Sequence, residues 1–165
     1  MQLVFPVADR SQRMSKMNKD RAEAEECPVA KTLEVLGDRW SLMIVRDAFD
    51  GIRRFGEFRH HLGLAKNILA GRLRDLVEHG ILRVAPASDG SAYHEYVLTE
   101  KGVQLFPIIV SLRQWGEEHL FSAGEQHSIL VDNLNGQPIS KLAVSSQQGQ
   151  VLDASDCHRE KVIKR

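Results

Sequence analysis

Residues 66–80 read Lys-Asn-Ile-Leu-Ala-Gly-Arg-Leu-Arg-Asp-Leu-Val-Glu-His-Gly, and they are the most informative segment of the chain. Apolar residues recur at i, i+4, i+7 and i+8, which is the spacing of one buried helix face: Leu69, Leu73, Leu76 and Val77. A second stripe is small and rich in hydrogen-bond donors: Lys66, Asn67, Ala70, Gly71 and Arg74. Such a helix can lie in the major groove of DNA, because small residues allow close approach and the donors read base edges. An ordinary amphipathic helix with a solvated basic side is the alternative that this segment alone leaves open.

Three shorter helices are predicted before this stretch. The first begins at Pro28 and ends at Gly37, the second is capped by Asp38 and stops near Gly51, and the third occupies about 54–61. The first helix carries a short apolar stripe: Val29, Thr32, Leu33 and Leu36. A tight turn that contains glycine joins the third helix to the helix at 66–79, and this pair predicts a helix-turn-helix.

A two-stranded ribbon and a long helix are predicted after Gly80. Strands at about 81–86 and 93–98 flank the turn signal Ser-Asp-Gly-Ser, and Tyr96 and Leu98 are expected on one face. Thr99 then caps a helix over about 100–120, which Pro107 bends or divides. The order of elements predicts a mainly α (α+β) fold, a winged helix-turn-helix with an added first helix and a long C-terminal helix.

The composition is that of an ordinary globular domain, with 42% hydrophobic and 27% charged residues in a chain of 165. Basic and acidic residues both number 22, so the net charge is zero with neutral histidine. The distribution of charge nevertheless favours nucleic-acid binding, since basic residues outnumber acidic ones between positions 51 and 85. The basic residues there are Arg53, Arg54, Arg59, Lys66, Arg72, Arg74 and Arg83, and the acidic residues are Glu57, Asp75 and Glu78.

Membrane and secreted classes are not favoured. No apolar run approaches the ~20 residues that a membrane span needs, and the first ten residues lack the order of a secretory signal. The two cysteines, Cys27 and Cys157, do not make a disulfide framework. We expect a cytoplasmic protein with no membrane partner.

Several motifs occur in a fixed order between Cys27 and Phe121. They are Cys-Pro-Val at 27–29, Leu-Gly-Asp-Arg-Trp-Ser at 36–41, Arg-Phe-Gly-Glu-Phe at 54–58, Arg-Leu-Arg-Asp-Leu at 72–76 and Glu-Tyr-Val-Leu-Thr-Glu-Lys-Gly at 95–102. On this joint order the chain resembles the HxlR-type family of bacterial winged helix-turn-helix transcriptional regulators. The resemblance implies a homodimer on a pseudopalindromic operator, with 66–79 as recognition helix and 81–98 as wing. Tyr93 stands where the family wing often has arginine, so a minor-groove contact is not carried over to this wing.

The candidate DNA-binding residues follow from the rule that phosphate contacts fix register and base contacts specify sequence. Contacts to bases or phosphates are predicted for Asn67, Arg72 and Arg74. Contacts to the DNA backbone are predicted for Lys66, Arg53, Arg54 and Arg59. Close approach is predicted at Ala70 and Gly71. Two alternatives stay open, because Arg74 can form a surface pair with Glu78 at i+4 and Arg72, beside Ile68, can brace the helix.

Cys27 is the candidate redox residue. It precedes Pro28 at a predicted helix start, where backbone N–H groups and the positive helix end lower a thiol pKa. The neighbouring Glu25 and Glu26 act in the opposite direction, and a small residue that packs the first helix is the alternative. Cysteines at this position sense oxidants or electrophiles in several family members, so the resemblance implies control by an oxidant or another small-molecule effector. The sequence predicts no catalytic residues, no metal site and no cofactor.

The chain is predicted to have three regions: an N-terminal extension (1–26), the winged helix-turn-helix domain (27–121) and a C-terminal tail (122–165). In the tail, Asn135-Gly136 predicts one hairpin, and the apolar segments 142–144 and 151–152 predict another. Helix 100–120 has a wider apolar surface than one small domain needs, which favours a homodimer.

The preferred hypothesis is a homodimeric regulator that binds double-stranded DNA and is not an enzyme. A winged-helix module for protein interactions without DNA binding is the main alternative, since the net charge is zero and the wing tip has no cation. A thiol oxidoreductase that uses Cys27 ranks third, because no second cysteine stands at Cys-x-x-Cys spacing.

Overall fold

The computed structural model describes residues 27–160, so the predicted extension 1–26 and the last five residues lie outside the described part. Four helices come first: α2 (Pro28–Leu36), α3 (Arg39–Phe49), α4 (Phe55–Leu62) and α5 (Lys66–Glu78). The wing and two further helices follow: β1 (Leu82–Pro86), β2 (His94–Leu98), α6 (Glu100–Val103) and α7 (Phe106–His119). The tail holds three short elements: β3 (Val144–Ser145), β4 (Val151–Leu152) and the 3-10 helix η1 (Ala154–Asp156). Within residues 27–160 the predicted winged helix-turn-helix is confirmed.

Local capping explains where the helices begin and turn. The Asp38 carboxylate accepts hydrogen bonds from the N–H groups of Trp40 and Ser41, so it satisfies two free donors at the start of α3. Between α4 and α5, Gly63 has φ +63°, in the left-handed region that glycine enters readily. Both features match the predicted cap and the predicted glycine turn.

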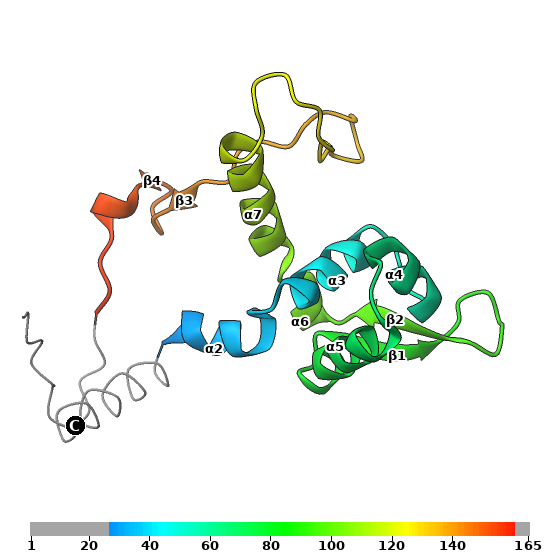
Figure 1. Ribbon diagram of the computed structural model, residues 1–165. Coiled ribbons are helices and arrows are strands. Elements are labelled where there is room, and N and C mark those ends of the chain that lie inside the picture. Colours follow the sequence, from blue (N-terminus) through cyan, green and yellow to red (C-terminus); the bar gives the residue numbers. More distant parts are fainter. Residues whose placement is uncertain (1–26, 161–165) are drawn as a thin grey trace, which may run out of the picture.

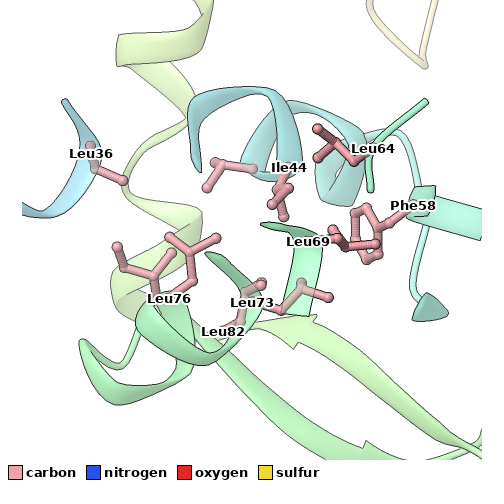
Figure 2. Close-up of a cluster of buried hydrophobic side chains, with 10 residues drawn as sticks. Leu36, Ile44, Phe58, Leu64, Leu69, Leu73, Leu76 and Leu82 are labelled. Atoms are coloured by element: carbon pink, nitrogen blue, oxygen red, sulfur yellow. The ribbon is translucent and has the colours of Figure 1, made fainter. Parts of the chain in front are cut away.

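The hydrophobic core lies between α3, α4, α5 and the wing (Figure 2). Leu69, Leu73 and Leu76 of α5 are fully buried, as their helical spacing predicted. They pack with residues from every neighbouring element, among them Leu36, Ile44, Val45, Phe58, Leu64, Ile81 and Leu82. Helix α5 is therefore held by its apolar side, which leaves its other side available.

The wing is an antiparallel ribbon in which Leu82 pairs with Leu98 and Pro86 with His94. The N–H of Tyr96 donates to the carbonyl of Arg53 at 2.8 Å, which ties the ribbon to the segment before α4. Tyr96 and Leu98 both pack against the core, so the predicted face is confirmed.

Gly102 brings α6 against the junction of α5 and β1. A Cβ at this glycine would lie 2.2 Å from the carbonyl oxygen of Ile81, so no larger residue fits without a shift of backbone. The Thr99 hydroxyl donates to the Gly80 carbonyl at 2.6 Å and accepts from the Gly102 N–H. Pro107 then stands in the first turn of α7, which confirms that the predicted long helix is divided.

The apolar stripe predicted for α2 is not a buried face in the described structure. Leu36 is buried, but Val29 is 66% exposed and Leu33 57% exposed. In Figure 1, α2 projects from the core on the side away from the wing, so only its C-terminal end reaches the core. The spacing predicted an apolar stripe correctly, but not that its own domain leaves it uncovered.

The tail leaves α7 and returns along it. The Arg113 guanidinium donates to the Ser128 carbonyl at 2.6 Å, and the Gln114 amide donates to the Ser140 carbonyl at 3.0 Å. The first predicted hairpin is reduced to a single bridge between Val131 and Pro138, whereas the second forms as β3–β4. Because β3 and β4 are each two residues long, the tail adds little core of its own.

Candidate nucleic-acid interface

Helix α5 has two chemically different sides. The three buried leucines face the core, and Lys66, Asn67, Ala70 and Arg74 are exposed, while Gly71 and Arg72 are half-buried. A Cβ at Gly71 would meet no atom within 4 Å, so this position is open to an approaching surface. The arrangement gives a helix front with small residues and hydrogen-bond donors, as a helix in the major groove requires.

Arg72 is held by carboxylates on two elements. Its Nε lies 3.2 Å from Oδ1 of Asp38, and its Nη1 lies 3.3 Å from Oδ2 of Asp75. Partial burial raises the pKa of Asp38, but donors from the Ser41 hydroxyl, the Ser41 and Trp40 N–H groups and the Arg72 charge lower this pKa below its ordinary value. Arg72 thus joins α5 to the cap of α3, which favours the bracing interpretation.

Arg74 is held much more loosely. Its side chain is 70% exposed, and its Nε lies 3.9 Å from Oε1 of Glu78, which is 65% exposed. The predicted surface pair is present at i, i+4, but an exposed pair at this distance holds the guanidinium weakly. Arg74 can therefore leave Glu78 for a base or phosphate at little cost.

The wing is joined to the start of α4 by a carboxylate cluster. The Arg54 guanidinium donates to Oδ2 of Asp89 at 2.5 Å, and this hydrogen bond is the main reason that the pKa of Asp89 lies well below its ordinary range. Glu95 is buried and accepts from the N–H and hydroxyl of Ser88 at 3.1 and 3.0 Å. Arg53 and Arg54 lie 3.7 and 3.8 Å from its carboxylate oxygens.

Sequence reasoning missed the role of Glu95. The Ser88 N–H lowers the pKa of the Glu95 carboxyl, desolvation by burial opposes this, and the Ser88 hydroxyl and the two arginines lower the pKa further. An acidic residue in a strand is usually solvated. The one feature of the sequence that could have indicated a buried carboxylate was the adjacent pair Arg53 and Arg54 before α4. The cluster orients the wing relative to the helix-turn-helix.

Two histidines at the end of α4 differ in their surroundings. His60 borders a hollow of about 450 Å³ beside the turn to α5, together with Arg59 and Gly63. His61 places its Nδ1 2.7 Å from Oδ2 of the buried Asp47, so it closes the end of α4 onto α3. No cluster of three or more metal-ligating side chains occurs within residues 27–160.

Cys27 is the N-cap residue of α2 and is half-buried. The Ala30 N–H lowers the pKa of its thiol, partial burial acts in the opposite direction, and the Val29 N–H and the Arg159 guanidinium of the tail lower it further. The net pKa is below the ordinary value, so the ionised fraction of this thiol at a given pH is larger than that of an ordinary cysteine. Cys157 is exposed in the tail.

A helix-turn-helix with a buried back, a donor-rich front and a following two-stranded ribbon defines the winged-helix class of DNA-binding proteins. The HxlR-like helix-turn-helix family matches residues 35–123. The chain belongs to this family.

Several relatives support this assignment. Rv3095 of Mycobacterium tuberculosis, an uncharacterized HTH-type transcriptional regulator, is 49% identical over 92 residues, which are 56% of this chain and 58% of the relative. The chain thus matches less than two thirds of that relative. The crystal structure of PA1607, a candidate transcription factor, is similar with 53% identity and a TM-score of 0.78 over 82% of this chain and 95% of the other. The redox regulator HypR in its reduced form is 34% identical, with a TM-score of 0.52 over 57% of this chain and 94% of HypR.

These relatives are named as regulators rather than enzymes. Among residues 27–160, no helix has the length and apolar character needed to cross a membrane.

Proposed function

We propose that the protein acts as a homodimer whose two α5 helices enter successive major grooves of a pseudopalindromic operator. The observation that carries this proposal is the exposed, donor-rich side of α5 behind which three leucines are fully buried. A helix fixed by its core can present its donors without losing much conformational freedom on binding. Two such helices related by two-fold symmetry would be about 34–36 Å apart on B-form DNA.

The candidate residues divide by their contacts within the protein. Asn67 and Arg74 are exposed and are proposed to contact bases or phosphates. Lys66 and Arg59 are also exposed and are proposed to contact the DNA backbone. Arg54 and Arg72 already bind carboxylates of the protein. We infer that these two arginines mainly position the wing and α5, and that only their remaining N–H groups reach phosphates.

The dimer is proposed to form through α7 and α2. Ile108, Leu112 and Trp115 follow one stripe of α7 at i, i+4 and i+7, and they are 40, 51 and 58% exposed. Val29 and Leu33 of α2 add the exposed apolar stripe described above. Apolar stripes of this kind are stabilised when a second copy covers them.

Duplex selection followed by a salt series tests this function. A duplex enriched from random sequences should bind the purified protein, with log K falling against log salt by about 0.9 per phosphate contact. Light scattering should give the mass of a dimer. A strictly monomeric protein that binds no duplex at low salt contradicts the proposal and favours the protein-interaction alternative.

We further propose that Cys27 makes DNA binding sensitive to oxidants. The support is its place at the start of α2, its lowered pKa and the similarity to HypR, which is named as a redox regulator. A peroxide oxidises a thiolate to sulfenic acid, which a second thiol converts to a disulfide with release of water. Such a change would act on the subunits through α2, which is part of the proposed dimer surface.

A cysteine variant tests the redox proposal. Peroxide should change the duplex affinity of the wild type and leave Cys27→Ser unaffected, with Cys157→Ser as the matched control that still responds. Wild-type duplex binding that is insensitive to peroxide, or a response that disappears in Cys157→Ser instead, contradicts the role of Cys27.

A further inference from the structure

A cavity of about 420 Å³ lies between α3 and α7 and is not used by the DNA-binding surface. Leu42 and Met43 of α3 line one side, and Ile109 and Leu112 of α7 line the other. Phe121, just after α7, and His127 of the tail border one end, with their ring centres 4.8 Å apart. This volume falls in the range of small-molecule sites, which are lined mainly by apolar side chains.

The tail holds the end of this cavity in place. Arg113 donates to Oε1 of Glu117 at 3.0 Å, to the Ser128 carbonyl at 2.6 Å and to the Ser128 hydroxyl at 3.0 Å. The Ser122 N–H donates to Oε2 of Glu125 at 2.9 Å, which closes the turn that directly follows Phe121. The cavity wall is therefore built from tethered segments rather than from one exposed face.

The rim of the cavity has an excess of positive charge. Arg39, Arg46 and Arg113 line it, and Glu117 is the one carboxylate among the lining residues. Arg46 is bound to Asp47 and Arg113 to Glu117. Arg39 instead lies 4.0 Å from the centre of the Trp40 ring, and no carboxylate of residues 27–160 forms an ion pair with it. An apolar space with a guanidinium at its edge suits an aromatic ring that bears an anionic group.

The stripe proposed for the dimer is adjacent to this cavity but distinct from it. Ile109, Leu112, Arg113 and Gly116 line the cavity at i, i+3, i+4 and i+7, whereas Ile108, Leu112 and Trp115 form the outward stripe. Leu112 alone belongs to both. A second copy on the outward stripe would therefore leave most of the cavity lining uncovered.

We propose that the cavity between α3 and α7 is a binding site for an aromatic organic anion, with the ring against the apolar walls and the anionic group at Arg39. As the site of an effector it rests on the regulator function proposed above, but as a binding site it is tested without DNA. Its position allows coupling, because the cap of α3 is bound to Arg72 of the recognition helix.

Gly116 lines the cavity, so a larger side chain at this position would occupy it. A Cβ at Gly116 would meet no atom within 4 Å. Every other residue except proline also has a more favourable helix propensity than glycine. Anilinonaphthalene sulfonate, an aromatic anion whose fluorescence rises in apolar sites, serves as the probe. Gly116→Phe should weaken its binding to the full chain by about tenfold, and the matched control Gly116→Ala by less than about twofold, in line with the volume each side chain adds.

The charge requirement is tested with Arg39→Gln and a neutral probe. This variant should weaken binding of the sulfonate by about fivefold, as expected for a solvent-accessible charge pair. Binding of phenylnaphthylamine, which has the same rings without the sulfonate, should not change. This comparison remains valid if Gly116→Phe fails to fold, since Arg39 lies on the exposed edge of α3.

Unchanged sulfonate affinity in folded Gly116→Phe overturns the proposal. Trp115→Ser, on the outward stripe of α7, tests whether the probe binds there instead. If Trp115→Ser loses probe binding and Gly116→Phe does not, the proposal is overturned as well. Equal loss of both probes in Arg39→Gln overturns the anion requirement. Failure of these titrations leaves the regulator function standing, because duplex binding is measured separately. Failure of duplex binding in turn leaves the titrations unaffected.

Discussion

Arg72 and Arg74 lie two positions apart on α5, and their replacement by alanine should affect different properties of the protein. Arg74 is 70% exposed and lies 3.9 Å from its carboxylate partner, whereas Arg72 is 40% exposed and contacts two carboxylates at 3.2 and 3.3 Å. We expect Arg74→Ala to weaken binding to a selected duplex and Arg72→Ala to lower the stability of the fold. The contrast follows from which partner each guanidinium already has.

The magnitudes come from these contacts. An exposed i, i+4 pair contributes about 0.3–0.5 kcal/mol, so Arg74→Ala should change the free energy of unfolding by less than about 0.5 kcal/mol. Loss of a contact to a base should weaken duplex binding by about 1–3 kcal/mol, roughly 5- to 150-fold. Loss of two partly exposed contacts to carboxylates should reduce the free energy of unfolding of Arg72→Ala by about 0.5–1.5 kcal/mol.

Fluorescence anisotropy with a labelled duplex and urea unfolding followed by tryptophan emission measure the two quantities. Both variants must be compared at the same folded fraction and the same salt concentration, because phosphate contacts depend strongly on salt. The proposed roles of the two arginines are wrong if Arg72→Ala binds the duplex as weakly as Arg74→Ala while its free energy of unfolding equals that of the wild type. Wild-type duplex affinity in Arg74→Ala would also contradict them.

Three further predictions follow from the structure. Gly102→Ala should lower the free energy of unfolding by about 1–3 kcal/mol in urea titrations, because its Cβ would lie 2.2 Å from the Ile81 carbonyl oxygen; an unchanged midpoint and slope would show that α6 relaxes freely. Trp115→Glu should convert the proposed dimer to a monomer in light scattering, since a charge would enter the apolar stripe; a mass that stays that of a dimer would place the interface elsewhere. The folded-state pKa of Asp38 is below its ordinary value of 3.8, so the ionised Asp38 stabilises the fold above pH 3.8, and this contribution is lost as pH falls through the folded-state pKa. Asp38→Asn should therefore reduce the dependence of the free energy of unfolding on pH in the acid range. A pH profile identical to that of the wild type would contradict this prediction.

The helices and the ribbon could be predicted from sequence because their signals are local. The spacing of Leu69, Leu73 and Leu76 sets one side of α5 whatever surrounds it, and capping by Asp38 and Thr99 acts within three residues of each side chain. The two-piece C-terminal helix followed in the same way from Pro107. For these elements the nearest neighbours in sequence are also the physical cause.

The candidate site was predictable only in part. Periodicity identified the side of α5 that carries Lys66, Asn67 and Arg74, because residues three or four apart share a helix face. It could not show that Arg72 reaches the cap of α3, since that contact depends on how two helices cross. The same limit applies to Arg54, whose partner Asp89 lies 35 positions further along the chain.

From sequence alone it is possible to predict which residues share a face and about where the helices and the wing strands begin and end, because these properties arise from interactions over a few residues. Only the tertiary structure decided what covers each face. It buried Glu95 beside Ser88, left the apolar stripe of α2 exposed and opened a cavity between α3 and α7. The physical reason is that burial depends on the packing of segments far apart in the chain, and local spacing constrains that packing without specifying the partner.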